Sequence, residues 1–276
     1  MRQFVADDGE IIHYVTTGEG PPIVLLHGWT SSHLDWTPFL DAFAARHRVL
    51  CPDARGHGGH ALKTATAPNL ARMAEDLHQL LAVGDLTHAT LVGHSMGALT
   101  VWQYLRDFGA ERVAHAVIID QSPRLVTDAD WPHGIYGDFD AERNTNFIAA
   151  LEHDFAEAVL RLVAEGMNAE AARRYLRNGK GIQSVRRQLR SLAPKPLIDC
   201  WRSLTDADLR DSLAAIPIPV LLVYGEHSEF YTLEAARTVH ARIPDATLRI
   251  YEGTDHSPHL WQRERFAGDV LTFLGT

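Results

Sequence analysis

Short aliphatic runs alternate with longer stretches of helical periodicity along most of this chain. The run Ile23–Leu26 is apolar at every position, which is typical of a central parallel strand with helices on both faces. The alternation predicts an α/β fold with a mostly parallel central sheet and helices on both faces. Strands are expected at Ile11–Thr16, Ile23–Leu26, Arg48–Cys51, Ala89–Val92, Val113–Ile119, Val220–Tyr224 and Leu248–Tyr251, and helices at Leu70–Leu81, Met96–Phe108, Leu233–Arg242 and Phe266–Leu274.

The alternation stops between about Pro123 and Ile216, where no strand is evident. The composition there favours helices rich in Ala, Arg, Leu and Glu, as in 141–166 and 169–176. Four prolines punctuate the end of this stretch, at positions 194, 196, 217 and 219. An all-helical insertion in an α/β pattern indicates a cap over the carboxyl edge of the sheet.

The length of 276 residues allows one large core that needs no disulfide or metal to fold. We expect residues 1–123 and 217–276 to form this core, and residues 124–216 to form the helical cap. The two cysteines, Cys51 and Cys200, form no CxxC motif and are expected to be reduced and partly buried.

The charge balance excludes several classes of partner. With 26 Lys and Arg against 35 Asp and Glu, the net charge is −9, so the chain lacks the electrostatic footprint of a protein that binds nucleic acid or an anionic membrane. No window approaches 18 uninterrupted apolar residues, and the first ten residues carry acids where a signal peptide has an apolar region. We therefore expect a cytoplasmic protein whose partner is a small-molecule substrate. No pattern indicates an oligomeric state.

The segment Gly93-His94-Ser95-Met96-Gly97 fits G-x-S-x-G, and it lies between an expected strand and an expected helix. A sharp strand-to-helix turn forces the serine into a strained backbone conformation, and larger residues two positions away would collide with adjacent backbone. This geometry holds the hydroxyl of Ser95 clear at the end of the strand, above a helix N-terminus that favours negative charge. Ser95 is therefore the candidate nucleophile.

Two further segments complete the expected chemistry. His27-Gly28-Trp29 follows the buried strand, so the backbone amides of Trp29 and Met96 are expected to form an oxyanion hole. His256 lies between the last expected strand and the last helix, and an imidazole there would take the proton of the serine hydroxyl. We interpret His27 as a loop histidine bonded to backbone.

These segments resemble the α/β-hydrolase fold superfamily over nearly the whole chain. The shared points are His27-Gly28, Pro52–Gly58, Gly93–Gly97 and Asp255-His256. The resemblance implies the fold and a Ser–acid–His triad, while members of the superfamily differ in substrate: many accept esters, and others cleave C–C bonds or lactones or perform oxygenations.

The position of the triad acid departs from the pattern that this resemblance implies. The acid usually follows the strand after the cap, three residues past a glycine, and that position here is Ser228. Serine cannot supply the negative charge that stabilises an imidazolium. Asp120, at the end of the strand that follows the nucleophile helix, is our candidate acid, as in some dehalogenases and cofactor-free dioxygenases of the superfamily. Glu229 and Glu226 remain the alternatives.

We therefore expect a serine hydrolase of a small to medium, partly apolar ester, thioester or lactone. Ser95 would attack the carbonyl carbon, His256 would act as base and then acid, and Asp120 would orient the imidazole. Water would release the acyl-enzyme, so no organic cofactor and no metal are needed. The histidine pairs His57/His60 and His256/His259 lack the further ligands of a metal site.

The cap supplies aromatic residues that could line an apolar pocket over Ser95, with packing of cap on core as the alternative role. Trp131 is our candidate substrate-binding residue among them. The full set is Trp131, Tyr136, Phe139, Phe147 and Trp201.

The alternative function is a cofactor-independent dioxygenase of the quinaldine type, in which the histidine deprotonates an aromatic hydroxyl and the substrate anion meets O₂. The sequence resembles these enzymes in the position of Asp120 and in Gly28-Trp29, and departs from them in His27 and in its ordinary elbow. A non-catalytic binding protein on the same fold is a third possibility. Ester turnover, O₂ consumption or binding without turnover distinguishes the three.

Overall fold

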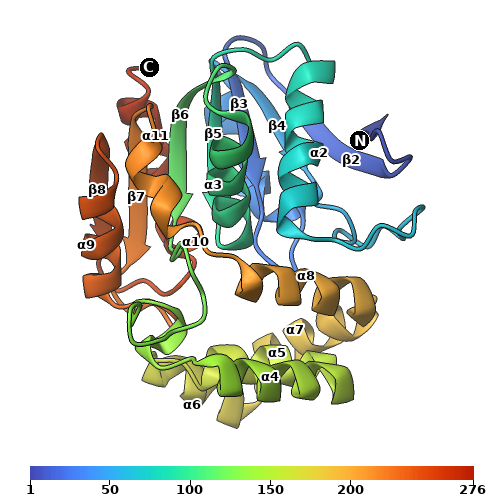
Figure 1. The fold of residues 1–276 in the computed structure, drawn as a ribbon, viewed down its shortest axis with the longest axis vertical. Helices are drawn as coiled ribbons and strands as arrows, with labels where there is room; N and C mark the ends of the chain where they lie inside the picture. Colours follow the sequence, from blue (N-terminus) through green and yellow to red (C-terminus); the bar gives the residue numbers. More distant parts are fainter.

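The computed structural model describes residues 1–276 and contains one eight-stranded sheet (Figure 1). The strand order is β1-β2-β4-β3-β5-β6-β7-β8. The pairs β1–β2 and β2–β4 are antiparallel and every other pair is parallel, which confirms the mostly parallel sheet. The strands are β1 (Arg2–Val5), β2 (Ile11–Thr17), β3 (Pro22–Leu26), β4 (Arg48–Pro52), β5 (Ala89–His94), β6 (Val113–Ile119), β7 (Val220–Gly225) and β8 (Ala246–Tyr251).

Helices cover both faces of the sheet, because alternate residues of each central strand point to opposite sides. Val24 and Leu26 of β3 belong to an apolar cluster with α2, α3 and α9, whereas Ile23 and Leu25 pack with η1, α1 and α11. The helical elements are η1 (His33–Phe39), α1 (Leu40–Ala44), α2 (Leu70–Val83), α3 (Met96–Phe108), η2 (Ile135–Gly137), α4 (Ala141–His153), α5 (Phe155–Ala164), α6 (Ala169–Arg177), α7 (Lys180–Ser191), α8 (Pro194–Asp206), η3 (Arg210–Ala215), α9 (Leu233–Arg242), α10 (Pro258–Trp261) and α11 (Arg263–Phe273). None of them combines the length and apolar character needed to cross a membrane.

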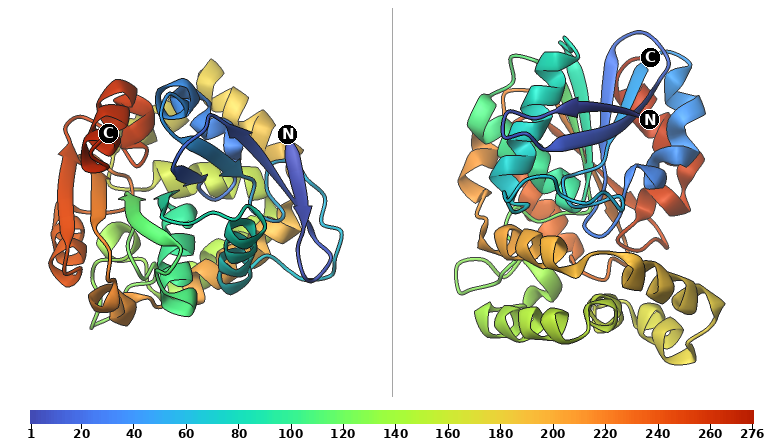
Figure 2. Two further views of the ribbon diagram at one scale, coloured as in Figure 1. Left: turned by 90° about the horizontal axis from the view of Figure 1, so that it is seen from above. Right: turned by 90° about the vertical axis from the view of Figure 1, so that its right-hand side faces the viewer.

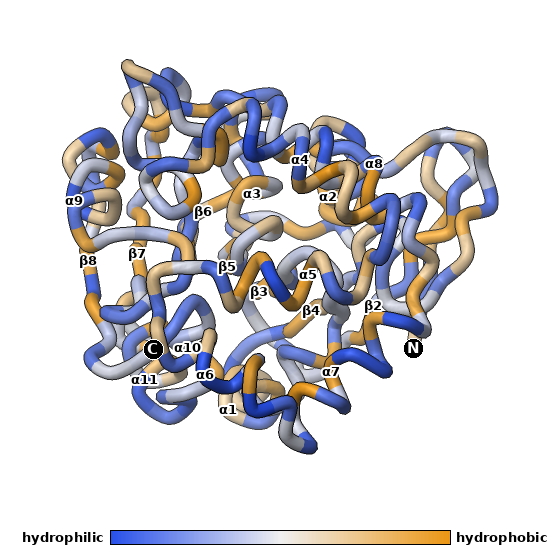
Figure 3. The backbone as a smooth tube through the Cα atoms, turned by 90° about the horizontal axis from the view of Figure 1, so that it is seen from below, coloured by the Kyte–Doolittle hydropathy of each residue, from blue (hydrophilic) through white to orange (hydrophobic).

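Helices α4 to α8 form a separate layer at the carboxyl ends of the strands (Figure 2). The expected helix over 141–166 is wrong as a single element, because Asp154 ends α4 and caps α5 by accepting a hydrogen bond from the amide of Glu157 at 3.2 Å. Pro194 likewise begins α8 at its first position, where proline needs no hydrogen-bond acceptor, instead of marking the end of the helical stretch. Helices α6 and α7 are mainly hydrophilic (Figure 3).

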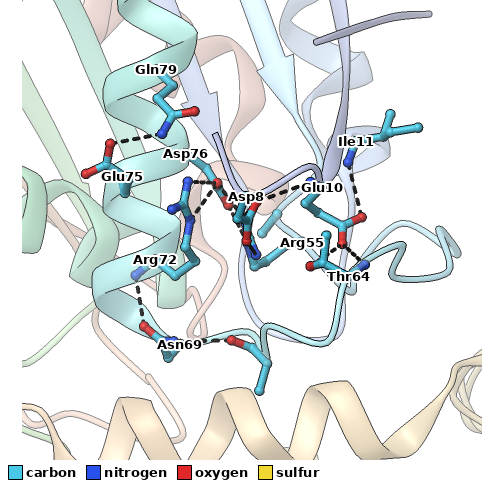
Figure 4. Close-up of polar contacts among 12 residues, drawn as sticks. Asp8, Glu10, Ile11, Arg55, Thr64, Asn69, Arg72, Glu75, Asp76 and Gln79 are labelled. Atoms are coloured by element: carbon cyan, nitrogen blue, oxygen red, sulfur yellow. Dashed lines mark hydrogen bonds and ion pairs between the residues drawn. The ribbon is translucent and has the colours of Figure 1, made fainter. Parts of the chain in front are cut away.

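A buried ion-pair network fastens the β1–β2 hairpin to α2 (Figure 4). The fully buried side chain of Arg55, in the loop after β4, donates to Asp76 of α2 through Nε and Nη2, both at 2.7 Å. The same guanidinium donates to Asp8 of the hairpin at 2.8 Å, and it holds the pKa of Asp8 below its ordinary range. A second cation, Arg72 of α2, also contacts Asp76 at 3.0 Å, so Arg55 is the cation that joins all three segments, which are distant in sequence.

We expect Arg55→Leu to lower the free energy of unfolding by about 3 kcal/mol, because it leaves Asp8 without a cation and leaves the buried Asp76 with Arg72 alone. Urea denaturation followed by circular dichroism measures this loss. Arg106→Leu is the matched control: Arg106 is 44% exposed and pairs only with Asp107, so it should cost less than about 1 kcal/mol. Equal losses in the two variants would contradict the network's role.

Candidate active site

The turn between β5 and α3 has the strained geometry expected of a nucleophile elbow. Ser95 has φ 52° and ψ −116°, a conformation that a non-glycine residue rarely adopts. A Cβ atom on Gly93 would lie 2.4 Å from the carbonyl carbon of Gly97, and a Cβ atom on Gly97 would lie 2.2 Å from the carbonyl oxygen of Leu26. Only glycine fits at these two positions, so the sequence pattern follows from the turn.

Ser95 and His256 border one cavity beneath the cap. The Ser95 hydroxyl makes no hydrogen bond in this structure; such contacts often form only once substrate is bound. His94 donates from Nε2 to the carbonyl oxygen of His256 at 3.0 Å, and its ring centroid lies 4.9 Å from that of His256. Burial lowers the pKa of His94 to about 3, so a neutral ring holds the histidine loop against the elbow.

The structure brings Asp120 and His256 together. Oδ1 of Asp120 lies 3.2 Å from Nδ1 of the His256 ring, and the carboxyl group is fully buried. Asp120 follows β6 with φ 46°, a left-handed conformation that turns its side chain toward β7 and the histidine loop. The backbone amide of Gly225 donates to Oδ2 at 2.9 Å. Burial raises the pKa of Asp120, and the donors around the carboxyl group oppose that shift.

Ser228, at the usual acid position, serves the relocated carboxylate instead. Its hydroxyl donates to Oδ1 of Asp120 at 2.9 Å and accepts hydrogen bonds from the amides of Phe230 and Tyr231 at 3.1 and 3.2 Å. The sequence identified Ser228 only as a residue without charge. The sequence did contain a signal for this role. A hydroxyl group three residues after Gly225 stands where the family usually places the triad carboxylate, so it can donate a hydrogen bond to a carboxylate that reaches the same histidine from another strand.

The two glutamates of the same loop contact the histidine segment through its backbone. Glu229 accepts from the amide of His256 at 2.9 Å, and burial raises its pKa to about 7. Glu226 accepts from the amide of Gly253 at 2.9 Å. No hydrogen bond joins either carboxylate to the imidazole ring.

Trp29 and Met96 both border the cavity. The amide of Trp29 donates no hydrogen bond, and the amide of Met96 stands at the start of α3, where no earlier helical carbonyl exists to accept it. The ring of His27 lies 2.8 Å from the carbonyl oxygen of Gly28 through Nδ1, and it accepts from the amide of Ala54 at 3.0 Å through Nε2. The interpretation of His27 as a backbone-bonded loop histidine is confirmed.

The cavity has a volume of about 240 Å³ and is mainly apolar. Its walls come from the cap, from the β5–α3 turn and from the loops after β3, β6, β7 and β8. The apolar residues around it include Trp29, Leu125, Ile135, Val159, Leu162, Trp201, Phe230 and Tyr231. The sequence did not identify Leu125, Ile135, Phe230 or Tyr231, because only the three-dimensional packing brings them over Ser95.

Trp131 does not line this cavity, so the expectation that it binds substrate is corrected. Its side chain is 1% exposed, and its indole N–H lies 3.1 Å from both Ser122 Oγ and the carbonyl oxygen of Arg124. Trp201 does line the cavity; its ring lies 4.7 Å from that of Trp29 and its Nε1 donates to Asn144 at 3.0 Å. The two tryptophans differ in their partners, which composition does not reveal.

The histidines that the sequence suggested as metal ligands, His57 and His60, contact protein groups instead. Nε2 of His60 lies 3.0 Å from Asp53, and Nδ1 of the buried His57 lies 3.1 Å from the carbonyl oxygen of Arg55. The structure contains no group of three or more His, Cys, Asp or Glu side chains with a metal-binding arrangement.

Comparison with known proteins agrees with this fold. The family model for the alpha/beta hydrolase fold matches residues 21–262. The chain belongs to the α/β-hydrolase fold family, which confirms the predicted fold class and the expectation of an α/β-fold hydrolase.

Individual relatives show how diverse the named activities are. A non-heme chloroperoxidase of Kitasatospora aureofaciens is 29% identical over 97% of this chain and 97% of its own. A pimeloyl-(acyl-carrier protein) methyl ester esterase of Vibrio vulnificus is 28% identical over 96% of this chain and 98% of its own. The structure of a bromoperoxidase from Bacillus anthracis covers 100% of both chains with a TM-score of 0.85 and 27% identity.

Proposed function

We propose that this protein hydrolyses a small to medium, partly apolar carboxylic ester, thioester or lactone through an acyl-enzyme on Ser95. The observation that supports this proposal most directly is the contact of 3.2 Å between Asp120 and the ring of His256, at the edge of the cavity that Ser95 also borders. The similarity to a named ester hydrolase agrees with it.

In the proposed mechanism, Oγ of Ser95 attacks the carbonyl carbon while the free ring nitrogen of His256 takes the hydroxyl proton. Asp120 stabilises the imidazolium, and the amides of Trp29 and Met96 donate to the oxyanion. The tetrahedral intermediate expels the alcohol or thiol, which receives the proton from His256. Water then loses a proton to His256 and attacks the acyl carbon, and the carboxylic acid leaves as Ser95 regains its proton.

The cavity bears on the class of substrate. No lysine or arginine lies among the residues around it, and Asp35 is the one carboxylate there. The cavity is also bordered by His94 and His256, and burial lowers the pKa of both rings. A negatively charged acyl group would find no cation there and would face Asp35. We therefore infer that the acyl group is neutral and that aliphatic and aromatic contacts with the cap bind it.

A screen of p-nitrophenyl esters from acetate to decanoate tests the proposal, together with a fluorophosphonate probe mapped by mass spectrometry. Turnover of neutral esters and a label on Ser95 are expected. Absence of turnover across the series, with no label on Ser95, would overturn the proposal.

The position of Asp120 also favours a second candidate, the cofactor-independent dioxygenase. His256 would then deprotonate an aromatic hydroxyl, and the resulting anion would react with O₂ without a role for Ser95 as nucleophile. Consumption of O₂ with hydroxylated aromatic compounds, in the absence of ester turnover, would select this function. Tight binding with neither reaction would select a binding protein.

Trp201 is expected to set the preference for acyl length. Trp201→Phe removes part of the cavity wall, so the ratio of kcat/KM for decanoate to that for butyrate should rise about tenfold. Trp131→Phe is the matched control, because Trp131 packs outside the cavity; it should lose stability through its indole hydrogen bonds and keep the wild-type ratio. An unchanged ratio in Trp201→Phe would place the acyl group elsewhere.

A further inference from the structure

Glu229 lies between the cap and the histidine loop, and its side chain contacts both. The residue is 4% exposed. Oε2 accepts from the backbone amide of His256 at 2.9 Å, and Oε1 accepts from the side-chain amide of Asn168 at 3.3 Å. Asn168 caps the N-terminus of α6, where its own oxygen accepts from the amide of Glu170. One carboxylate thus joins the start of a cap helix to the backbone of His256.

The cap turn before α6 is docked on the same loop by its backbone. The amide of Met167 donates to the carbonyl oxygen of Glu229 at 2.9 Å. The side-chain amide of Asn168 donates to the backbone carbonyl oxygen of His227, also at 2.9 Å. A Cβ atom on Gly166 would lie 2.5 Å from the carbonyl oxygen of Glu229, so the backbones of these two segments are in close contact. A shift of this cap turn must therefore move Glu229 as well.

We propose that Glu229 is a positioning residue whose ionised carboxylate couples the cap to His256, holding the histidine loop in place when the cap is seated. This inference rests on the proposed function for its effect on turnover. It assigns Glu229 no contact with substrate, and it separates Glu229 from Asp120, which faces the imidazole ring itself.

The surroundings of Glu229 make this coupling depend on pH. The titratable and charged groups that face it from the neighbouring elements are Asp255 and His256 of the β8–α10 loop, Asp120 after β6 and Tyr136 of η2, while the cap turn presents the neutral amide of Asn168. Burial, together with the charge of Asp255, raises the pKa of Glu229 to about 7, although the hydrogen bond from the His256 amide opposes this shift. The His256 amide meets a carboxylate above this pH and a carboxylic acid, a weaker acceptor, below it.

The sign of the effect on stability is opposite to that on activity. The pKa of Glu229 in the folded protein exceeds its ordinary value, so between the two values the folded state holds a proton that the unfolded state has lost. Stability therefore falls as the pH rises toward 7, and the charge that favours activity costs stability. Glu229→Gln should accordingly raise the thermal midpoint at pH 8. If the carboxylate only stabilised the fold, the same substitution would lower that midpoint.

The kinetic test compares Glu229→Gln with Glu226→Gln, which changes the exposed carboxylate that contacts the same loop at Gly253. We expect wild-type kcat/KM for a p-nitrophenyl ester to fall about five- to tenfold from pH 8 to pH 6. Glu226→Gln should keep this step. In Glu229→Gln, kcat/KM should stay at the value that the wild type has at pH 6 across this whole range. The remaining pH dependence should come from His256, whose pKa burial lowers to about 4.

Asn168→Asp provides the test from the cap side, because aspartate still caps α6 but replaces the amide donor by a negative charge. We expect it to move the step at pH 7 upward. The backbone amide shift of His256, followed by NMR from pH 5 to 9, reports the same ionisation without substrate. It should titrate near pH 7 in wild type and in Glu226→Gln, and be flat in Glu229→Gln.

The outcomes separate the two proposals. An amide shift that titrates identically in wild type and Glu229→Gln, or a pH profile that Glu229→Gln leaves unchanged, would overturn the role of Glu229. Absence of ester turnover and of a label on Ser95 would overturn the proposed function, and the amide shift would still decide whether Glu229 controls the histidine loop.

Discussion

Replacing Ser95 by alanine is expected to lower kcat for ester hydrolysis by about 10⁶-fold, the scale of the loss in serine proteases without their nucleophile. The remaining rate would come from the oxyanion donors and from substrate binding, which do not need the hydroxyl. The fold should be unaffected, because the Ser95 hydroxyl makes no hydrogen bond and glycines provide the close approach at the elbow. Single-turnover kinetics with the best p-nitrophenyl ester measures the effect.

Ser257→Ala is the control for this variant, since Ser257 borders the same cavity but lies outside the elbow. It should still react with a fluorophosphonate at Ser95 and keep kcat within about tenfold of wild type. A label on Ser257, or a Ser95→Ala variant with more than about one hundredth of the wild-type kcat, would show that another group performs the chemistry.

The features that the sequence predicted are those fixed by local physics. The apolar runs of β3, β5 and β6 must be strands because both faces are covered, and the glycines around Ser95 must be small because the turn leaves no room. Strand β1 was not predicted, because it is a four-residue edge strand that buries only Phe4 and so carries little periodicity.

The features that the sequence did not predict depend on contacts between distant segments. Trp131 and Trp201 are both aromatic residues of the same insertion, and only the path of the chain seats one over Ser95 and the other against Ser122. The pairing of Ser228 with Asp120 spans 108 positions, and a side-chain hydrogen bond of this kind leaves no periodic trace. The hydrogen bonds of Glu229 with His256, Asn168 and Met167 also join distant segments, so the sequence pattern does not predict them.

Replacing Asp120 by asparagine is expected to lower kcat by about 10⁴-fold. The amide keeps the shape of the carboxyl group but removes the charge that stabilises the imidazolium. It also presents an N–H₂ group to Nδ1 of His256, which favours the tautomer with its proton on the nitrogen that should accept from Ser95. Glu226→Gln should cost far less, because Glu226 contacts only the backbone of Gly253. If Asp120→Asn stays active while Glu229→Gln loses all turnover, the acid lies in its usual loop.

Ser228→Asp gives this prediction a second, sharper form, because its effect should reverse sign with the residue at position 120. In the wild-type background it places a second carboxylate against the one that Ser228 now contacts at 2.9 Å, so repulsion in a buried site should lower both stability and kcat. In the Asp120→Asn background the new carboxylate is the only one within reach of the His256 ring, and the asparagine amide can donate to it. We therefore expect Asp120→Asn/Ser228→Asp to recover about tenfold or more of the lost kcat. If the double variant is no more active than Asp120→Asn, a carboxylate at position 228 cannot accept the hydrogen bond from Nδ1 of His256, and only the residue at the end of β6 can.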